Sequence, residues 1–294
     1  MNLRDIKLRI RSVRKTQQIT RAMKMVAAVK FRHAQARLIN ARPYAARILD
    51  LSARALAGSE PGADQHPLLR RQPVRRILLI IVASDKGLCG SFNHNVYRAA
   101  QRFIKEQAVA QAAGLPEVGL WLIGRKINDA FKHFHSPGLK CELFRYLPQA
   151  EANPAEIAVQ LGELFRKSRY DRVTAIYTEF KSVMQNSVIQ ESLLPMDDTQ
   201  LSGTARPDAL STLVEPALPD ILEDLLPRLL TSRVQQILME SAASEQGTRM
   251  NMMDQATKNA DDLIAQLMQN YNKARQWSIT RELTDLTTGV EAMA

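Results

Sequence analysis

The sequence predicts an α/β protein with a long antiparallel two-helix coiled coil, formed by the N- and C-terminal helices, and a central Rossmann-like α/β domain. Apolar residues at gaps of three and four run through both ends of the chain. Between them, apolar runs alternate with amphipathic segments, which is typical of a sheet covered by helices. We expect a helix at 1–57, a linker at 58–73, the α/β domain at 74–196, a linker at 197–218, and a helix with its tip at 219–294.

The C-terminal helix gives the clearest helical pattern. From Arg228 to Leu286 the chain has no proline, and Gly247 is the one glycine. Because each helical residue adds about 1.5 Å, this segment would be about 88 Å long. A helix far above the usual ~8–20 residues needs a partner of similar length to cover its apolar face. We expect Pro227 to kink this helix or to restart it.

Residues 3–57 supply that partner. Pro43 lies inside this segment and is expected to bend or break the helix. The chain leaves the first helix at Gly58 and enters the second near Pro219, so the two helices should run antiparallel. The expected apolar stripe consists of Ile6, Ile10, Val13, Ile19, Met23, Val26, Val29, His33, Ala36, Ile39, Tyr44, Ile48 and Leu51.

The middle of the chain predicts a sheet. Residues 77–83 form a continuous β-branched and leucine run, which is typical of a buried strand in a parallel sheet. Further strands are expected at 119–124, 140–146, 172–180 and 185–194, and helices at 93–113, 126–133 and 154–168. The longest aliphatic run, Ile77 to Ala83, is too short to cross a membrane. No secretory signal is expected, so Cys89 and Cys141 should be reduced.

The net charge of +10 is unevenly distributed. Residues 1–57 hold fourteen basic and two acidic residues, a net charge of +12, whereas residues 219–294 hold seven basic and eleven acidic ones, a net charge of −4. The basic helix has two interpretations. It could bind nucleic acid or an anionic membrane, or it could complement the acidic helix or an acidic protein partner. The scarcity of aromatic residues beside the basic ones weakens a single-stranded nucleic-acid interpretation.

The sequence predicts no catalytic residue, no metal site and no cofactor. Gly87 and Gly90 follow a strand and precede a helix, but the phosphate-binding glycine motifs are missing. The five histidines lack metal-ligand spacing. Cys89 lies near a helix start, which could lower its pKa, but no base is indicated beside it. We therefore expect no turnover by the chain alone.

Three stretches resemble the gamma subunit of F-type ATP synthases. Residues 10–28 are similar to the opening helix of that family, residues 84–93 to its loop after the first strand, and residues 271–283 to its C-terminal signature. Their order and spacing also match, so the resemblance covers essentially the whole chain.

The resemblance implies a role as the central rotating stalk, which couples transmembrane ion flow to ATP synthesis or hydrolysis at the beta subunits. It implies alpha and beta subunits in a hexameric ring, an epsilon subunit and a ring of c subunits as partners, with no nucleic acid and no homo-oligomer. It also implies a peripheral membrane protein on the cytoplasmic side of a bacterial inner membrane. The alternative is a basic coiled-coil adaptor that binds nucleic acid or anionic membrane.

The resemblance also assigns contact residues. It places a polar catch for a beta-subunit loop at Arg275, Gln276, Thr280 and Glu282, and further rotor–stator contacts at Met23, Lys24, Lys86 and Cys89. It places an apolar tip inside the sleeve of the ring at Val290, Ala292 and Met293. Lys24 and Trp277 depart from the family pattern, where an acidic and a small residue are familiar.

Overall fold

A computed structural model of the chain describes two compact units. Its described residues are 3–57, 66–110, 117–132, 134, 141–182, 185–196 and 217–291. The first unit combines Met1–Val29 with Arg249–Ala294, and the second unit is Lys30–Thr248. The predicted linkers fall largely on residues 58–65 and 197–216, which lie outside the described residues. The predicted domain boundaries stay a prediction.

Two long helices run through both units. Helix α1 spans Leu3–Ala57 and helix α6 spans Leu218–Glu291. Pro43 lies inside α1 and Pro227 inside α6, and neither ends its helix, so of the expected alternatives the break at Pro43 and the restart at Pro227 do not occur, and a bend or kink stays a prediction. Each proline removes an N–H and frees the carbonyl four residues earlier. Those carbonyls belong to the exposed residues Ile39 and Glu223, where water can reach them.

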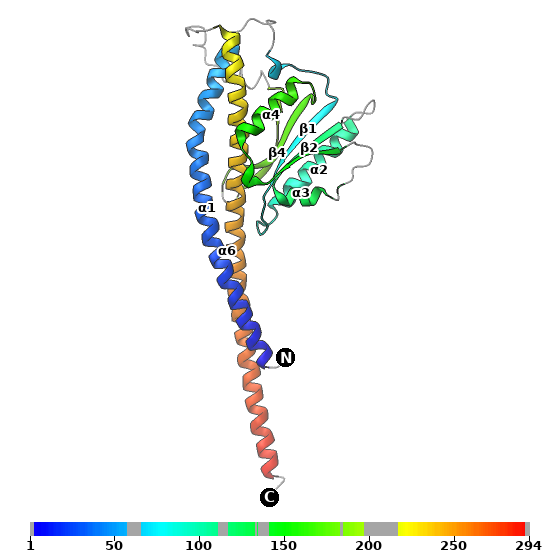
Figure 1. The fold of residues 1–294 in the computed structure, drawn as a ribbon. Helices are drawn as coiled ribbons and strands as arrows, with labels where there is room; N and C mark the ends of the chain where they lie inside the picture. Colours follow the sequence, from blue (N-terminus) through cyan, green and yellow to red (C-terminus); the bar gives the residue numbers. More distant parts are fainter. Residues whose placement is uncertain are drawn as a thin grey trace. The chain divides into compact units, whose positions relative to one another are not determined.

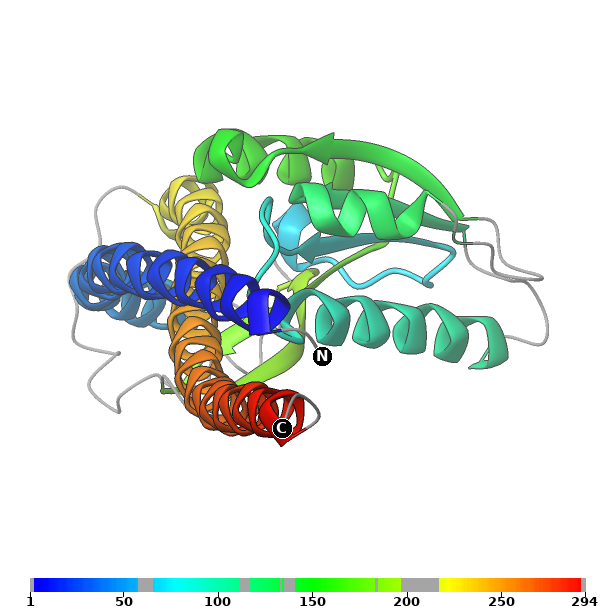
Figure 2. The same cartoon turned by 90° about the horizontal axis from the view of Figure 1, so that it is seen from below.

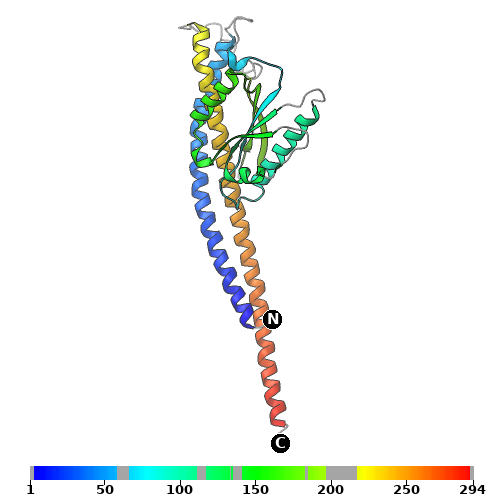
Figure 3. The same ribbon diagram turned by 45° about the vertical axis from the view of Figure 1, so that its right-hand side comes forward.

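In the first unit the two helices lie side by side and antiparallel, as predicted (Figures 1 and 3). Their seam buries small and medium side chains: Ile6 and Ala27 on α1, and Met253, Ala260 and Leu267 on α6. Helix α6 continues beyond the N-terminal end of α1.

The residues predicted to form the α1 seam are partly the wrong ones. Ile19 is 60% exposed, and Val26 and Val29 are also exposed. Ala27 and the half-buried Thr20 take their place, because small side chains let two helices approach closely. A spacing of three and four therefore found the helix but only part of the face that its partner covers.

The second unit contains a five-stranded sheet. Its strands are β1 (Arg76–Val82), β2 (Glu117–Ile123), β3 (Cys141–Leu147), β4 (Arg172–Phe180) and β5 (Asn186–Leu194). The spatial order is β3-β2-β1-β4-β5, with β5 antiparallel to β4 and the other pairs parallel. Only a short connection joins β4 to β5, and parallel strands would need a longer crossover. All five strands lie within two residues of their predicted positions.

Helices cover both faces of this sheet (Figures 1 and 2). Successive side chains of β1 point to opposite faces, and both sets are buried: Ile77, Leu79 and Ile81 on one side, and Leu78 and Ile80 on the other. The first face packs against α2 (Phe92–Ala110) and α3 (Arg125–Phe131). The second packs against α4 (Pro154–Arg166) and, within this unit, against α1 and α6.

Gly124, between β2 and α3, provides a test of this fold. Its φ is +106°, and an added Cβ would lie 2.2 Å from the carbonyl oxygen of Ala83. Gly124→Ala should therefore destabilise the protein by on the order of 1–3 kcal/mol, because the residue is strained and the neighbour is rigid backbone. The free energy of unfolding from urea titration measures this change.

Gly162, inside α4, is the matched control. An added Cβ there would meet nothing within 4 Å. Gly162→Ala should stabilise the chain by about 0.5–1 kcal/mol, since alanine loses less conformational entropy in a helix. Equal stability of the two variants would contradict the assigned backbone conformation at Gly124.

Candidate functional site

The loop after β1 holds two of the predicted contact residues. Cys89 is 1% exposed, and its sulfur accepts a hydrogen bond from Asn93 Nδ2 at 3.3 Å. Lys86 is exposed, and its carbonyl lies 3.8 Å from the Cys89 sulfur. Cys89 is therefore packed inside its own loop, while Lys86 reaches the surface. A direct partner contact at this loop would fall to Lys86 and to the exposed Leu88.

Asp85 organises the same end of the sheet. Its carboxylate accepts hydrogen bonds from the backbone N–H groups of Arg125 at 2.9 Å, Gln149 at 3.1 Å and Ala150 at 3.4 Å. In open α/β sheets, ligands bind beyond the carboxyl ends of the strands, where such donors meet them. Here an internal carboxylate already occupies the donors. The loop is built to join β1 to its neighbours in the sheet.

The described residues contain no cluster of three or more histidine, cysteine, aspartate or glutamate side chains that could hold a metal ion. Within the same described ranges, none of the helices has the length and apolar character needed to span a bilayer.

A ladder of polar contacts joins the helices of the first unit. Lys24 Nζ lies 2.6 Å from Asp254 Oδ1, and the hydroxyls of Thr20 and Thr257 lie 2.9 Å apart. One turn further along, Gln17 donates a hydrogen bond to Asp261. Each step toward the N-terminus of α1 is a step toward the C-terminus of α6, which fixes the antiparallel register.

Lys24 forms an ion pair with Asp254, and its side chain stays 44% exposed. The hydrogen bond from Lys24, followed by that from Lys258, lowers the pKa of Asp254 below its ordinary value of 3.8. The positive charge that departs from the family pattern at Lys24 therefore has a partner on α6. Met23, the neighbouring predicted contact, is half-buried.

The predicted catch residues lie on the part of α6 that follows its last buried seam residue, Leu267. Arg275, Gln276, Thr280 and Glu282 are all exposed. Gln276 and Thr280 are one turn apart, and Arg275 and Glu282 are two turns apart, so the four occupy adjoining faces. Thr280 donates to the Gln276 carbonyl at 2.9 Å, and Glu282 accepts from Ser278 at 3.3 Å. The side chains of Arg275 and Gln276 make no hydrogen bond with the described residues, so their donors are available.

Large apolar side chains lie among these polar ones. Trp277 is 67% exposed, and Ile279, Leu283 and Leu286 are exposed as well. A concentration of exposed apolar side chains marks a protein interaction surface. The predicted tip cannot be placed in the same way: Ala292 and Met293 lie outside the described residues, and at Val290 the helical backbone alone is described.

Comparisons with known proteins match this architecture over its whole length. A family model described as ATP synthase matches residues 2–293. The ATP synthase gamma chain of Geobacter sp. strain M21 is 40% identical over 293 residues, which is 99% of both chains. The gamma chain of Chlorobaculum parvum is 38% identical and covers 99% of this chain and 98% of its own.

The chain belongs to the ATP synthase gamma-chain family. Among solved structures it is similar to a chain of the Tetrahymena thermophila mitochondrial ATP synthase, in a structure of the central stalk and c-ring. That chain is 28% identical with a TM-score of 0.55, and the match covers 81% of this chain and 99% of that one. A Euglena gracilis mitochondrial ATP synthase chain shows the same fold, with 18% identity, a TM-score of 0.65, and coverage of 99% and 94%.

For this gamma-chain family member, two groups of predicted residues lie on one helix pair. Met23 and Lys24 lie on the paired part of α1, and Arg275, Gln276, Thr280 and Glu282 lie further along α6. Lys86 and Cys89 belong to the other unit. The sequence analysis missed Asp254, Thr257 and Asp85. Asp85 could have been predicted from the sequence, because an acidic residue directly after a buried strand lies where backbone N–H groups of the neighbouring loops can donate to it.

The Lys24–Asp254 pair predicts a pH effect. Because the folded-state pKa of Asp254 is lowered, the pair stabilises the fold above the ordinary pKa, and that contribution is lost as the pH falls through the folded value. Lys24→Ala should therefore raise the pKa of Asp254 and reduce stability at neutral pH, with the difference vanishing in acid. An NMR titration of the Asp254 carboxyl carbon measures the shift.

Lys15→Ala is the control, since Lys15 is an exposed lysine on the same helix. It should leave the Asp254 titration unchanged. If both lysine variants moved the Asp254 pKa equally, the effect would be a general one of net charge rather than of the pair.

Proposed function

We propose that this chain is the central rotating stalk of an F-type ATP synthase, coupling ion flow across a membrane to ATP synthesis or hydrolysis at the beta subunits. The observation that carries the proposal is the run of α6 past Leu267. It is helical through Glu291, but its side chains from Met268 to Thr288 are exposed or half-buried, and several are large and apolar. A single helix of this kind is marginal in water without a surrounding partner.

The proposed partners are a hexameric ring of alpha and beta subunits around the end of α6, an epsilon subunit, and a ring of c subunits. The gamma-chain relatives and the similarity to a central-stalk chain support this assignment. The ring would cover Trp277, Ile279, Leu283 and Leu286, and would enclose the tip at Val290, Ala292 and Met293. This chain itself would be non-catalytic.

The proposed location is the cytoplasmic side of a bacterial inner membrane, as a peripheral part of the complex. The bacterial relatives support it. Anchoring would then come from the c subunits.

Arg275, Gln276, Thr280 and Glu282 would form the polar catch with a beta-subunit loop. Lys24 and Lys86 would face acidic groups of the ring, together with the exposed basic residues on the part of α1 that belongs to the first unit. Exposed ion pairs of this kind are each worth about 0–1 kcal/mol. A surface with many weak contacts has no single geometry that would trap the stalk, which suits a part that must turn.

The catch predicts a loss of coupled synthesis. Gln276→Leu combined with Thr280→Val removes two hydrogen-bonding groups, each worth about 0.5–1.5 kcal/mol. In a complex reconstituted with its membrane sector, ATP synthesis should fall about fivefold or more, measured as ATP formed under an imposed ion gradient. Helix content measured by circular dichroism should stay unchanged.

Gln255→Leu with Asn259→Val is the matched control. These residues are also exposed and one turn apart on α6, and synthesis should stay within about twofold of the unmodified complex. If the catch variant and the control variant synthesised ATP equally well, the catch assignment would be wrong.

The exposed basic surface of α1 also fits the second candidate, an adaptor for nucleic acid or anionic membrane. The two functions differ in a direct assay. The stalk proposal predicts that alpha and beta subunits hydrolyse ATP at a sustained rate only when this chain is added. An adaptor would leave that rate unchanged and would bind DNA with an affinity that falls steeply with salt.

A further inference from the structure

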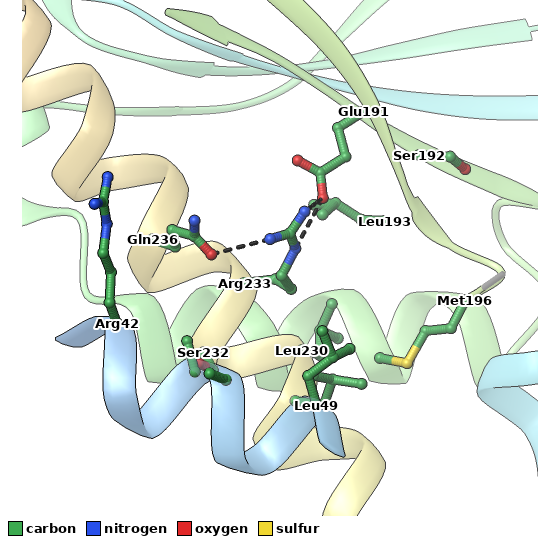
Figure 4. Close-up of a pocket in the computed structure, with 13 residues that line it drawn as sticks. Arg42, Leu49, Glu191, Ser192, Leu193, Met196, Leu230, Ser232, Arg233 and Gln236 are labelled. Carbon is green, nitrogen blue, oxygen red and sulfur yellow. Dashed lines mark hydrogen bonds and ion pairs between the residues drawn. The ribbon is translucent and has the colours of Figure 1, made fainter. Parts of the chain in front are cut away.

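The second unit contains a cavity that the stalk role does not use. Its volume is about 500 Å³, within the range of small-molecule sites, about 300–1,000 Å³. Its walls come from α1, from β5 and the residues after it, and from α6 (Figure 4). This space is a pocket open to solvent, since Arg42, Ala46 and Ser192 in its wall are exposed. A space of this size is therefore a candidate binding site.

Small side chains on α1 create the space. Ala45 and Ala46 face it where larger residues would fill it. The rest of the lining is largely aliphatic, with Leu49 of α1, Leu193 of β5 and Leu230 of α6. An occupant would therefore bury an apolar body.

One ion pair in the wall is already satisfied. Arg233 of α6 binds Glu191 of β5 through Nε at 2.9 Å and through Nη2, and it donates to Gln236 at 2.9 Å (Figure 4). The hydroxyl of Tyr177 donates to the other Glu191 oxygen at 2.9 Å. Burial raises the pKa of Tyr177, so that hydroxyl keeps its proton. These charges cancel and do not call for a ligand.

Two polar groups in the wall have no such partner. Arg42 of α1 is exposed and makes no hydrogen bond or ion pair with the described residues, so its guanidinium is available to an anion. Ser232 of α6 is only 5% exposed, and its hydroxyl has no hydrogen-bond partner among the described residues. A second cavity of about 150 Å³ is lined by the same two residues. Water can reach the Ser232 hydroxyl, which is not one of the fully buried polar atoms without a partner, so this hydroxyl can donate a hydrogen bond to a ligand oxygen in place of water.

We infer that this cavity binds a small monoanionic amphiphile, a free carboxylic acid with an apolar body. Its carboxylate accepts hydrogen bonds from the Arg42 guanidinium and the Ser232 hydroxyl, and its apolar body packs against Leu49, Leu193 and Leu230. Guanidinium and carboxylate match in geometry and charge. A dianion such as a phosphate monoester fits less well, because a single arginine without a partner lines the pocket.

This site involves none of the proposed catch or tip residues, so it stands apart from the stalk role. Its occupant would join α1 to β5 and α6 within the second unit. Binding should therefore also raise the unfolding temperature of the chain, since a ligand that binds the folded state alone stabilises that state.

The test uses the full-length chain with octanoate and with octanamide, which has the same length but no charge. Isothermal titration at pH 7 should show one octanoate per chain, bound at least about tenfold more tightly than octanamide, because a charge-assisted hydrogen bond is lost in the amide. Arg42→Gln should weaken octanoate binding about tenfold or more and should leave octanamide nearly unchanged.

Arg47→Gln is the matched control, since Arg47 is an exposed arginine of α1 that does not line the cavity. It should leave octanoate binding unchanged. Ala45→Leu narrows the cavity and should weaken both ligands, and Ser232→Ala should weaken octanoate without changing the shape of the site. Circular dichroism on each variant confirms that it is folded.

Three results would overturn the inference. Octanoate and octanamide could bind equally well, which would show that no charge is recognised. The Arg42 and Arg47 variants could behave alike, which would place the anion elsewhere. Octanoate could bind at many weak sites or fail to bind, which would show surface adsorption or an unsuitable cavity.

Discussion

The apolar surface of α6 is the constraint on which the rest of this structure depends, because a helix of 74 residues cannot cover its own apolar side chains. Between Leu229 and Glu245 the helix is buried on most sides, against the sheet and α1 of the second unit. From Met253 to Leu267 one stripe is buried, against α1 of the first unit. From Met268 to Thr288 no side chain is buried. The chain therefore covers part of the apolar surface of this helix itself. The apolar side chains near the C-terminal end of the helix are left for other proteins to cover.

The seam of the first unit shows why this helix pair is held by modest contacts. Its ladder consists of a lysine–aspartate pair, a threonine pair and a glutamine–aspartate hydrogen bond, all at least partly exposed. Such contacts fix the register of two helices without a thick core. A thin pair keeps nearly the whole circumference of both helices available as surface. That suits a part whose proposed role is to present different faces to its surroundings.

The α/β domain shares the strand order 3-2-1-4 with dinucleotide-binding domains, although its last strand is antiparallel, and internal side chains occupy the donors at the ends of its strands. Asp85 takes the backbone donors at the carboxyl ends of the strands, and Cys89 and Asn93 close the loop from inside. The fold is thus used as a scaffold on which α1 and α6 pack. The topology of this domain therefore does not indicate its function, whereas the residues at the ends of its strands do.

The sequence by itself determined the elements and the family. Each strand is a local run of apolar residues, and the pattern of Ile77 to Ala83 does not depend on distant partners. The two helices follow from spacing, and the catch residues from the resemblance of residues 271–283. Of the outcomes expected at the two prolines, the break at Pro43 and the restart at Pro227 do not occur, because a helix already held by its packing tolerates one lost hydrogen bond at a hydrated carbonyl.

Only the tertiary structure decided which face of α1 is covered, which acid Lys24 meets and where space is left. Ile19 and Val26 have the right spacing for a seam, yet Thr20 and Ala27 form it. The choice rests on how closely two backbones can approach, and that distance is a property of both helices together. The partner of Lys24 is 230 residues away, and the cavity beside Arg42 and Ser232 exists because three separate elements fail to fill one volume. Such features arise from packing between distant segments, and no local pattern in the chain encodes them.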